Sequence, residues 1–115
     1  MGNQWIDRVI SLLQLASYRA QRGYPVGKMP YLTAPAVAVC VEKIVPDGIT
    51  LRLDIYCPLK LGGEKCEDTA AGVLQTLVPL GGVLSAGPCR FDESMGLFTQ
   101  SVEAAFTQSE EPESE

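Results

Sequence analysis

The chain has 115 residues, a formal net charge of −5 and a hydrophobic fraction of 46%, which suits one globular domain with a single modest core. Four glutamates within residues 110–115 leave ten acidic and nine basic residues in the remainder. A nearly neutral body without a basic cluster argues against nucleic acid as the main ligand. No apolar run approaches the ~20 residues of a membrane-spanning helix, so no membrane is expected either.

The first predicted element is a helix from about Gln4 to Arg22, with Asn3 as its N-cap and Gly23 as its left-handed C-terminal residue. A wide apolar stripe follows the helical spacing: Trp5, Val9, Leu12, Ala16 and Ala20. Such a stripe suits a partner-binding or membrane-surface helix as well as core packing, and core packing is favoured.

Residues 24–35 (YPVGKMPYLTAP) contain three prolines and a glycine, which predicts an irregular connection. Its Tyr24, Met29 and Tyr31 are candidate protein contacts. Packing of the tyrosines onto the domain itself fits the sequence equally well.

Residues 36–58 predict a β-hairpin, because apolar and polar residues alternate on both sides of Pro46-Asp47-Gly48. A three-residue turn with Gly48 in the left-handed conformation keeps one face apolar. The predicted pairs on that face are Val45–Ile49, Val41–Leu53, Val39–Ile55 and Val37–Cys57. On the other face Glu42 lies opposite Arg52, an opposite-charge cross-strand pair.

Residues 58–63 predict a flexible link, in which Gly62 and Gly63 are further candidate contacts. A second helix is expected from about Glu64 to Val78, with Gly72 allowing close packing on the sheet. Its apolar face comprises Cys66, Ala70, Val73, Leu74 and Leu77.

A weaker strand is predicted over residues 83–91, at an edge or with a bulge because Gly87-Pro88 interrupts it. A turn at 92–96 leads to the last strand, residues 97–107. Its predicted apolar face contains Phe98, Val102, Ala104 and Phe106, interrupted by Gln100. The domain is therefore expected to span residues 1–107, followed by a disordered acidic tail at 108–115.

The expected fold is α+β in the order α-β-β-α-β-β, a mostly antiparallel four-stranded sheet with two helices packed on one face. The apolar side of the hairpin requires such a cover.

No catalytic signature is present. Cys66 near a helix N-terminus could act as a nucleophile, but the chain has no histidine to serve as its base, so an apolar filling role is favoured. Asp92 and Glu93 could bind a cation or form a carboxylate pair, although acidic residues are common in turns. The paired glycines lack the spacing of a phosphate-binding loop. We expect no enzyme activity.

The four cysteines lack the close spacing of zinc ligands, so no metal or other cofactor is expected. Their even number permits disulfides. The N-terminus lacks the pattern of a secretory signal, and free thiols in a reducing cytoplasm are favoured.

The helix, the valine-rich hairpin, the second helix and the closing segment FDESMGLFTQSVEAAF together resemble the tail terminator (tail completion) proteins of bacteriophages and prophages. The resemblance covers roughly residues 5–106 and consists of element order and hairpin character, so it assigns no functional residue.

The resemblance implies a structural, non-enzymatic subunit that forms a ring, commonly hexameric, at the head-proximal end of the tail tube. Its partners would be further copies of itself and other tail or head-joining proteins. Its location would be the cytoplasm of the bacterial host, and the virion after assembly. The alternative is a small adaptor or regulatory module that binds a protein through a strand edge or through residues 24–35.

Overall fold

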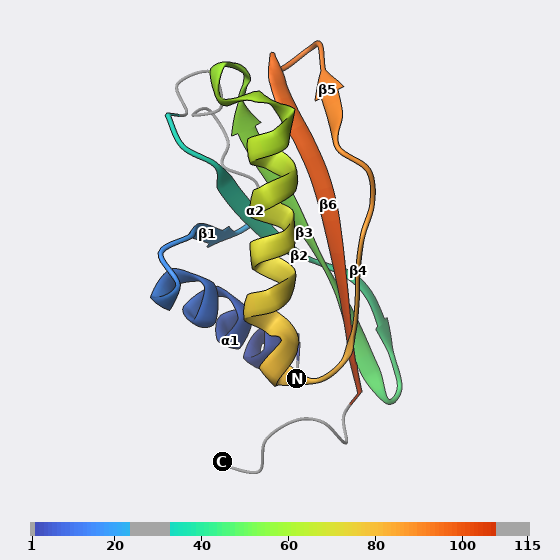
Figure 1. The fold of residues 1–115 in the computed structure, drawn as a ribbon. Helices are drawn as coiled ribbons and strands as arrows, with labels where there is room; N and C mark the ends of the chain where they lie inside the picture. The colour runs from blue at the N-terminus through green and yellow to red at the C-terminus, as the bar shows by residue number, and fades with distance from the viewer. Residues whose placement is uncertain (1, 24–32, 108–115) are drawn as a thin grey trace.

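The computed structural model describes residues 2–23 and 33–107, which form a six-stranded sheet with two helices on one of its faces (Figure 1). The elements are α1 (Gly2–Leu15), β1 (Arg19–Arg22), β2 (Ala36–Val45), β3 (Gly48–Pro58), the 3-10 helix η2 (Leu59–Leu61), α2 (Gly62–Leu77), the 3-10 helix η3 (Val78–Leu80), β4 (Val83–Ala86), β5 (Arg90–Asp92) and β6 (Leu97–Thr107).

The strand order is β1-β2-β3-β6-β4, with β5 also paired to β6. Only the β1–β2 pair is parallel among the described strands. The predicted α+β class, the mostly antiparallel sheet and the helices on one face are confirmed. The sheet has two more strands than predicted, because β1 was not foreseen and the weaker strand is divided into β4 and β5.

Helix α1 ends at Leu15, seven residues earlier than predicted, because Ser17 adopts the left-handed conformation (φ 74°). The backbone N–H of Tyr18 donates to the carbonyl oxygen of Leu13 at 3.0 Å, which closes the helix end in the manner of a Schellman motif. The chain then turns and β1 pairs with the start of β2. Asn3 lies inside the helix rather than at its N-cap.

The two helices supply one side of the core. In α1 the buried residues include Trp5, Val9 and Leu13, so core packing is confirmed for the part of the predicted stripe that lies in the helix. Ala16 is exposed, and Ala20 is buried in β1 instead. The Trp5 ring stacks on Phe106 of β6, with 4.1 Å between centroids. Helix α2 contributes Cys66, Ala70, Val73 and Leu77.

Gly72 of α2 allows a close contact, but not with the sheet as predicted. A Cβ atom there would overlap the hydroxyl group of Tyr18, in the turn that follows α1. The glycine therefore accommodates the connection between α1 and β1.

The turn of the β2–β3 hairpin contains two residues, Pro46 and Asp47, and Val45 lies opposite Gly48. The predicted three-residue turn is wrong, and Gly48 is not left-handed. It lies beside β6, where a Cβ atom would overlap the carbonyl oxygen of Phe106. Its lack of a side chain permits the close approach of β3 and β6.

A β-bulge between Val41 and Lys43 shifts the hairpin register, so that Val39 lies opposite Leu53 instead of the predicted Ile55. The shorter turn moves the pairing by one residue and the bulge moves it by one more. Because side chains alternate with period two, each residue before the bulge keeps its predicted face. The predicted pairs are wrong, but most of the predicted apolar face is buried: Val37, Val39, Ile49, Leu51, Leu53, Ile55 and Cys57. Val41 and Val45, which were predicted on the same face, are exposed.

The predicted flexible link at residues 58–63 is also wrong, because Pro58 ends β3, η2 follows, and Gly62 begins α2. The last strand has the predicted bounds, and β4 and β5 pair with it. Strand β4 is at an edge of the sheet, so the predicted edge position of the weaker strand is confirmed. Gln100, which interrupts the apolar face of β6, donates from its side-chain amide to the Gly87 carbonyl oxygen at 2.7 Å.

Among the described helices, none has both the length and the apolar character needed to cross a bilayer.

Candidate functional site

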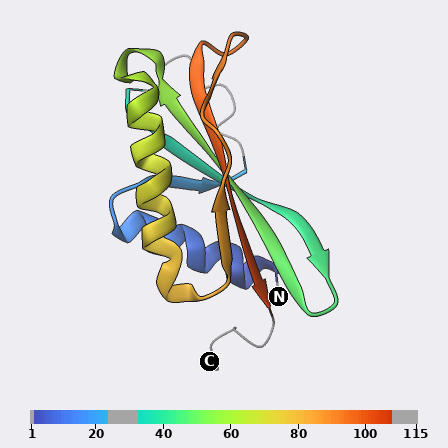
Figure 2. The same cartoon turned by 45° about the vertical axis from the view of Figure 1, so that its right-hand side comes forward.

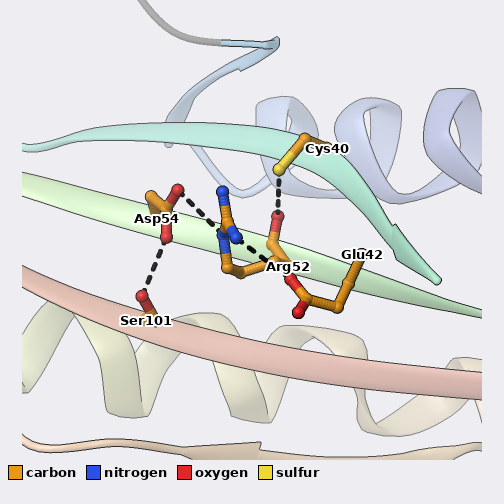
Figure 3. A network of polar contacts seen from close by, with 5 residues as sticks. All are labelled: Cys40, Glu42, Arg52, Asp54 and Ser101. Atoms are coloured by element: carbon orange, nitrogen blue, oxygen red, sulfur yellow. Dashed lines mark hydrogen bonds and ion pairs between the residues drawn. The ribbon is translucent and has the colours of Figure 1, made fainter.

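The face of the sheet opposite the helices carries a polar network (Figure 3). Arg52 and Asp54 are two residues apart on β3 and therefore project from the same face. The Arg52 Nε donates to Asp54 Oδ2 at 3.1 Å, and its Nη1 donates to Glu42 Oε1 at 3.0 Å. Ser101 lies opposite Asp54 on β6, and its hydroxyl donates to Asp54 Oδ1 at 2.8 Å. Three strands thus contribute to one network.

The β-bulge brings Glu42 into this network. The cross-strand neighbour of Arg52 is Cys40, not Glu42 as predicted. The extra residue of the bulge nevertheless presents the Glu42 carboxylate to the Arg52 guanidinium. The predicted ion pair is therefore confirmed, although the predicted backbone register is not.

Burial distinguishes the two carboxylates. Asp54 is 8% exposed, and each of its oxygens accepts a hydrogen bond, whereas Glu42 is exposed. Buried carboxylates require such partners.

Cys40 lies beside this network. The Cys40 thiol donates to the Arg52 carbonyl oxygen at 3.7 Å. Burial raises the pKa of the Cys40 thiol, which favours the thiol over the nucleophilic thiolate. The network orders this face and holds the Glu42 carboxylate of β2 against Arg52 of β3. It contains no nucleophile with an adjacent base.

A shallow concavity of about 330 Å³ lies on the same face. Its lining is mixed in charge and polarity: Glu42, Lys43, Thr50, Val83, Ser85, Glu103 and Ala105. A second concavity, of about 480 Å³, lies between α1 and the segment after α2, and it is lined by Gln4, Asp7, Arg8, Ser11, Leu12, Leu15 and Leu80. Neither concavity gathers a set of groups suited to catalysis.

Of the predicted contact residues, Gly62 and Gly63 are described, and neither belongs to the network. Tyr24, Met29 and Tyr31 lie outside the described residues. Gly62 opens α2 with φ 87°, and the Cβ position of Gly63 lies 3.5 Å from the Phe98 ring. Both are half-buried at the start of the helix.

Cys66 is fully buried, and its favoured role as a core residue is confirmed. Burial is the largest cause that raises the pKa of its thiol to about 12, and the nearby Cys89 raises it further. The Cys57 and Cys89 thiols donate to the carbonyl oxygens of Gly62 and Gly63 at 3.8 and 3.9 Å. All four cysteines are unbridged.

Asp92 organises the turn before β6. Its Oδ1 accepts hydrogen bonds from the Ser94 backbone N–H, the Ser94 hydroxyl and the Met95 backbone N–H, at 3.0, 2.7 and 3.2 Å. The hydroxyl bond is the largest cause that lowers the pKa of Asp92. The carboxylate therefore has a local role in the turn. Within the described residues no group of acidic, cysteine or histidine side chains is arranged to hold a metal ion.

Sequence reasoning did not single out the most exposed apolar positions. These are Leu15 at the end of α1, Ile44 in the hairpin and Val83 at the start of β4, which are 84%, 66% and 75% exposed. Periodicity predicted that Ile44 and Val83 lie in strands, but it could not show that no other described strand pairs with those edges.

Comparison of the chain with protein-family models, curated proteins and solved structures finds no match. The arrangement of side chains therefore carries the functional argument.

Proposed function

We propose that this protein is a structural, non-enzymatic subunit that acts by self-assembly, of the kind found at the head-proximal end of a phage or prophage tail. The main supporting observation is the separation of its exposed apolar residues. Leu15, Ile44 and Val83 lie at the end of a helix, in a hairpin and on an edge strand. A ring subunit needs at least two distinct contact surfaces, because each copy meets two neighbours.

The polar groups support the same proposal. Arg52 is held between two carboxylates, Asp54 is hydrogen-bonded by Ser101, and Asp92 is occupied by its own turn. These groups stabilise local structure and leave no reactive set in either concavity. The proposed partners are further copies of the chain, in a hexameric ring, and proteins of the tail tube or head connector. The proposed location is the host cytoplasm during assembly and then the virion.

Substitutions on the edge strand β4 test this proposal directly. Ring formation is measured by light scattering and negative-stain microscopy over a concentration series, with and without isolated tail tubes. Rings are expected in at least one condition. Val83→Asp should reduce their population by tenfold or more, because it places a charge in an apolar contact. Ser85→Asp is the matched control, since Ser85 is an exposed polar residue on the same strand, and it should form rings normally.

A protein that stays monomeric at millimolar concentration and forms no ring on any tail tube would contradict the proposal. Neighbouring genes are an independent check, because portal, tube and tape-measure genes are expected beside the gene of a tail subunit.

A further inference from the structure

Among the described residues, no strand pairs with the outer edge of β2 between Cys40 and Val45. Strand β1 pairs only with Ala36–Val39, and the last contact on this side is the Gly23 N–H donating to the Val39 carbonyl oxygen at 2.9 Å. No other described strand pairs with this edge. In Figure 2 this part of the hairpin extends away from both helices. Backbone groups on such an edge can accept another strand.

The bulge gives this edge an unusual order of side chains. Val41 and Ile44 point to the helix side of the sheet, because their partners Leu51 and Ile49 are core residues on that side. Glu42 and Lys43, between them, both point to the open face. Glu42 reaches Arg52, which projects from that face, and Lys43 lies opposite Thr50.

Cys40 and Val45 also lie on the open face, since they pair with residues of that face in β3. From Cys40 to Val45, the side chains therefore point to the open face, the helix side, the open face twice, the helix side and the open face. This order is the same when the strand is followed in the opposite direction. A second β2 strand running antiparallel can meet this edge with every side chain on the same face as its partner.

We infer that this edge pairs with the same edge of a second copy of the chain, related by a two-fold axis between Glu42 and Lys43. The second copy is favoured by charge complementarity, because each Glu42 then faces a Lys43. The cross-strand pairs, each occurring twice, are Cys40 with Val45, Val41 with Ile44, and Glu42 with Lys43.

Charges and bulges on edge strands also serve to prevent strand pairing. The adjacent opposite charges here act differently, because only the antiparallel two-fold register brings them together. A parallel in-register pair would place Glu42 against Glu42 and Lys43 against Lys43. The contact is short, so we expect a weak and reversible dimer.

This inference shares with the proposed function the premise that the chain associates with itself. It assigns the exposed Ile44 to the two-fold contact, which leaves Leu15 and Val83 for the two contacts of a ring. A two-fold contact cannot close a head-to-tail ring, so it is an additional interface.

Charge reversal provides the test, by sedimentation equilibrium of folded protein. Lys43→Glu or Glu42→Lys alone places like charges opposite each other at both pairs, and each should weaken dimerisation by about tenfold or more. An equimolar mixture of the two variants restores both opposite-charge pairs in a heterodimer. The mixture should therefore dimerise to within about threefold of the native protein.

A monomeric native protein, an undiminished dimer of Lys43→Glu, or a mixture that fails to associate would each overturn the inference. Thermal melts establish that the variants fold, which matters because Glu42→Lys also loses the ion pair with Arg52. Val83→Asp on the opposite edge should leave the dimer unchanged. If mixing the two charge variants restores dimerisation but no rings form on tail tubes, the proposed function is refuted and the two-fold contact still holds.

A cross-link tests the register independently. Val45→Cys places a thiol opposite Cys40 of the second copy, and the diazene oxidant diamide takes up two protons and two electrons as the two thiols form a disulfide. A covalent dimer is expected on a non-reducing gel, and Cys40→Ser in the same variant should abolish it. Val83→Cys is the control and should give no cross-link to Cys40. Failure of Val45→Cys to cross-link would count against this register.

Discussion

The structure requires a glycine at position 48 but not at position 63. Gly48 faces the Phe106 carbonyl oxygen with no room for a Cβ atom, whereas the Cβ position of Gly63 makes an ordinary contact with the Phe98 ring. The Phe106 carbonyl belongs to β6 and cannot move without disturbing the pairing of β6 with β3. Gly48 is therefore required by the approach of two strands, and Gly63 is not.

Gly48→Ala should lower the free energy of unfolding by about 1–3 kcal/mol, the usual cost of overpacking. Gly63→Ala lies in the first turn of α2 and should be neutral or stabilising by up to about 1 kcal/mol, the difference in helix propensity. Urea unfolding of both variants measures these effects. Equal stability of Gly48→Ala and the native protein would contradict the close approach of β3 and β6.

The buried Cys66 thiol predicts a dependence of stability on pH. Its pKa is raised from 9.0 to about 12 in the folded protein, mainly by burial. Between these values the unfolded chain releases the thiol proton and the folded chain retains it, so alkaline conditions favour unfolding. The contribution should be complete below pH 9 and be lost progressively towards pH 12.

Melting temperatures measured between pH 8 and about 11 should therefore fall more steeply for the native protein than for Cys66→Ala. The comparison of slopes removes the effect of lysine and tyrosine titration, which both proteins share. Parallel slopes would show that Cys66 is not shielded from solvent.

At the scale of elements, α1 depends on its contact with the sheet rather than on helix propensity. It has 14 residues, and a helix of this length is marginal in isolation. Trp5 is 1% exposed and stacks on Phe106 with an interplanar angle of 5°. This contact ties the first helix to the last strand.

Trp5→Ala should destabilise the protein by about 3–5 kcal/mol, because it removes a large buried side chain and leaves a cavity. Ser11→Ala, at an exposed position of the same helix, should change stability by less than about 0.5 kcal/mol. Chemical denaturation followed by circular dichroism distinguishes them. A small effect of Trp5→Ala would mean that α1 is not an integral part of the core.

In the hairpin, periodicity predicts the face on which a side chain lies but not its cross-strand partner. Alternation predicted most of the buried side chains of β2 and β3, because the faces of a strand follow from local geometry. Val41 and Val45, which it also placed on the apolar face, are exposed. The pairs were wrong by two residues beyond the bulge. A shift of an even number of residues leaves the faces unchanged, so the apolar pattern cannot distinguish these registers.

For the whole molecule, β6 is the strand that completes the sheet. It pairs with β3 along its full length and with both β4 and β5 on its other side. Its Val102, Ala104 and Phe106 are buried against the helices. Most of the fold therefore depends on contacts between segments far apart in the chain.

A chain that ends at Gly96 lacks this strand, and we expect it not to fold. Without β6, strand β3 loses its long neighbour, Trp5 loses its stacking partner, and β4 and β5 have no strand to pair with. Near-ultraviolet circular dichroism and proteolysis would show this as loss of the Trp5 signal and rapid cleavage. A cooperative melt of the shortened chain would contradict the central role of β6.

The sequence by itself determined the elements whose signal is local: the apolar stripe of α2 and the first part of that of α1, the faces of β3 and of β2 before its bulge, and the bounds of β6. Only the tertiary structure determined the conformation of residues 16–22. Ala20 fits a helical stripe in the sequence but is buried in β1, beside β2. The tertiary structure also decided the exposure of the β2 edge and the role of Gly48. The candidate contacts Tyr24, Met29 and Tyr31 stay predictions. Local alternation determines which way a side chain points, but exposure depends on neighbours that are distant in the chain.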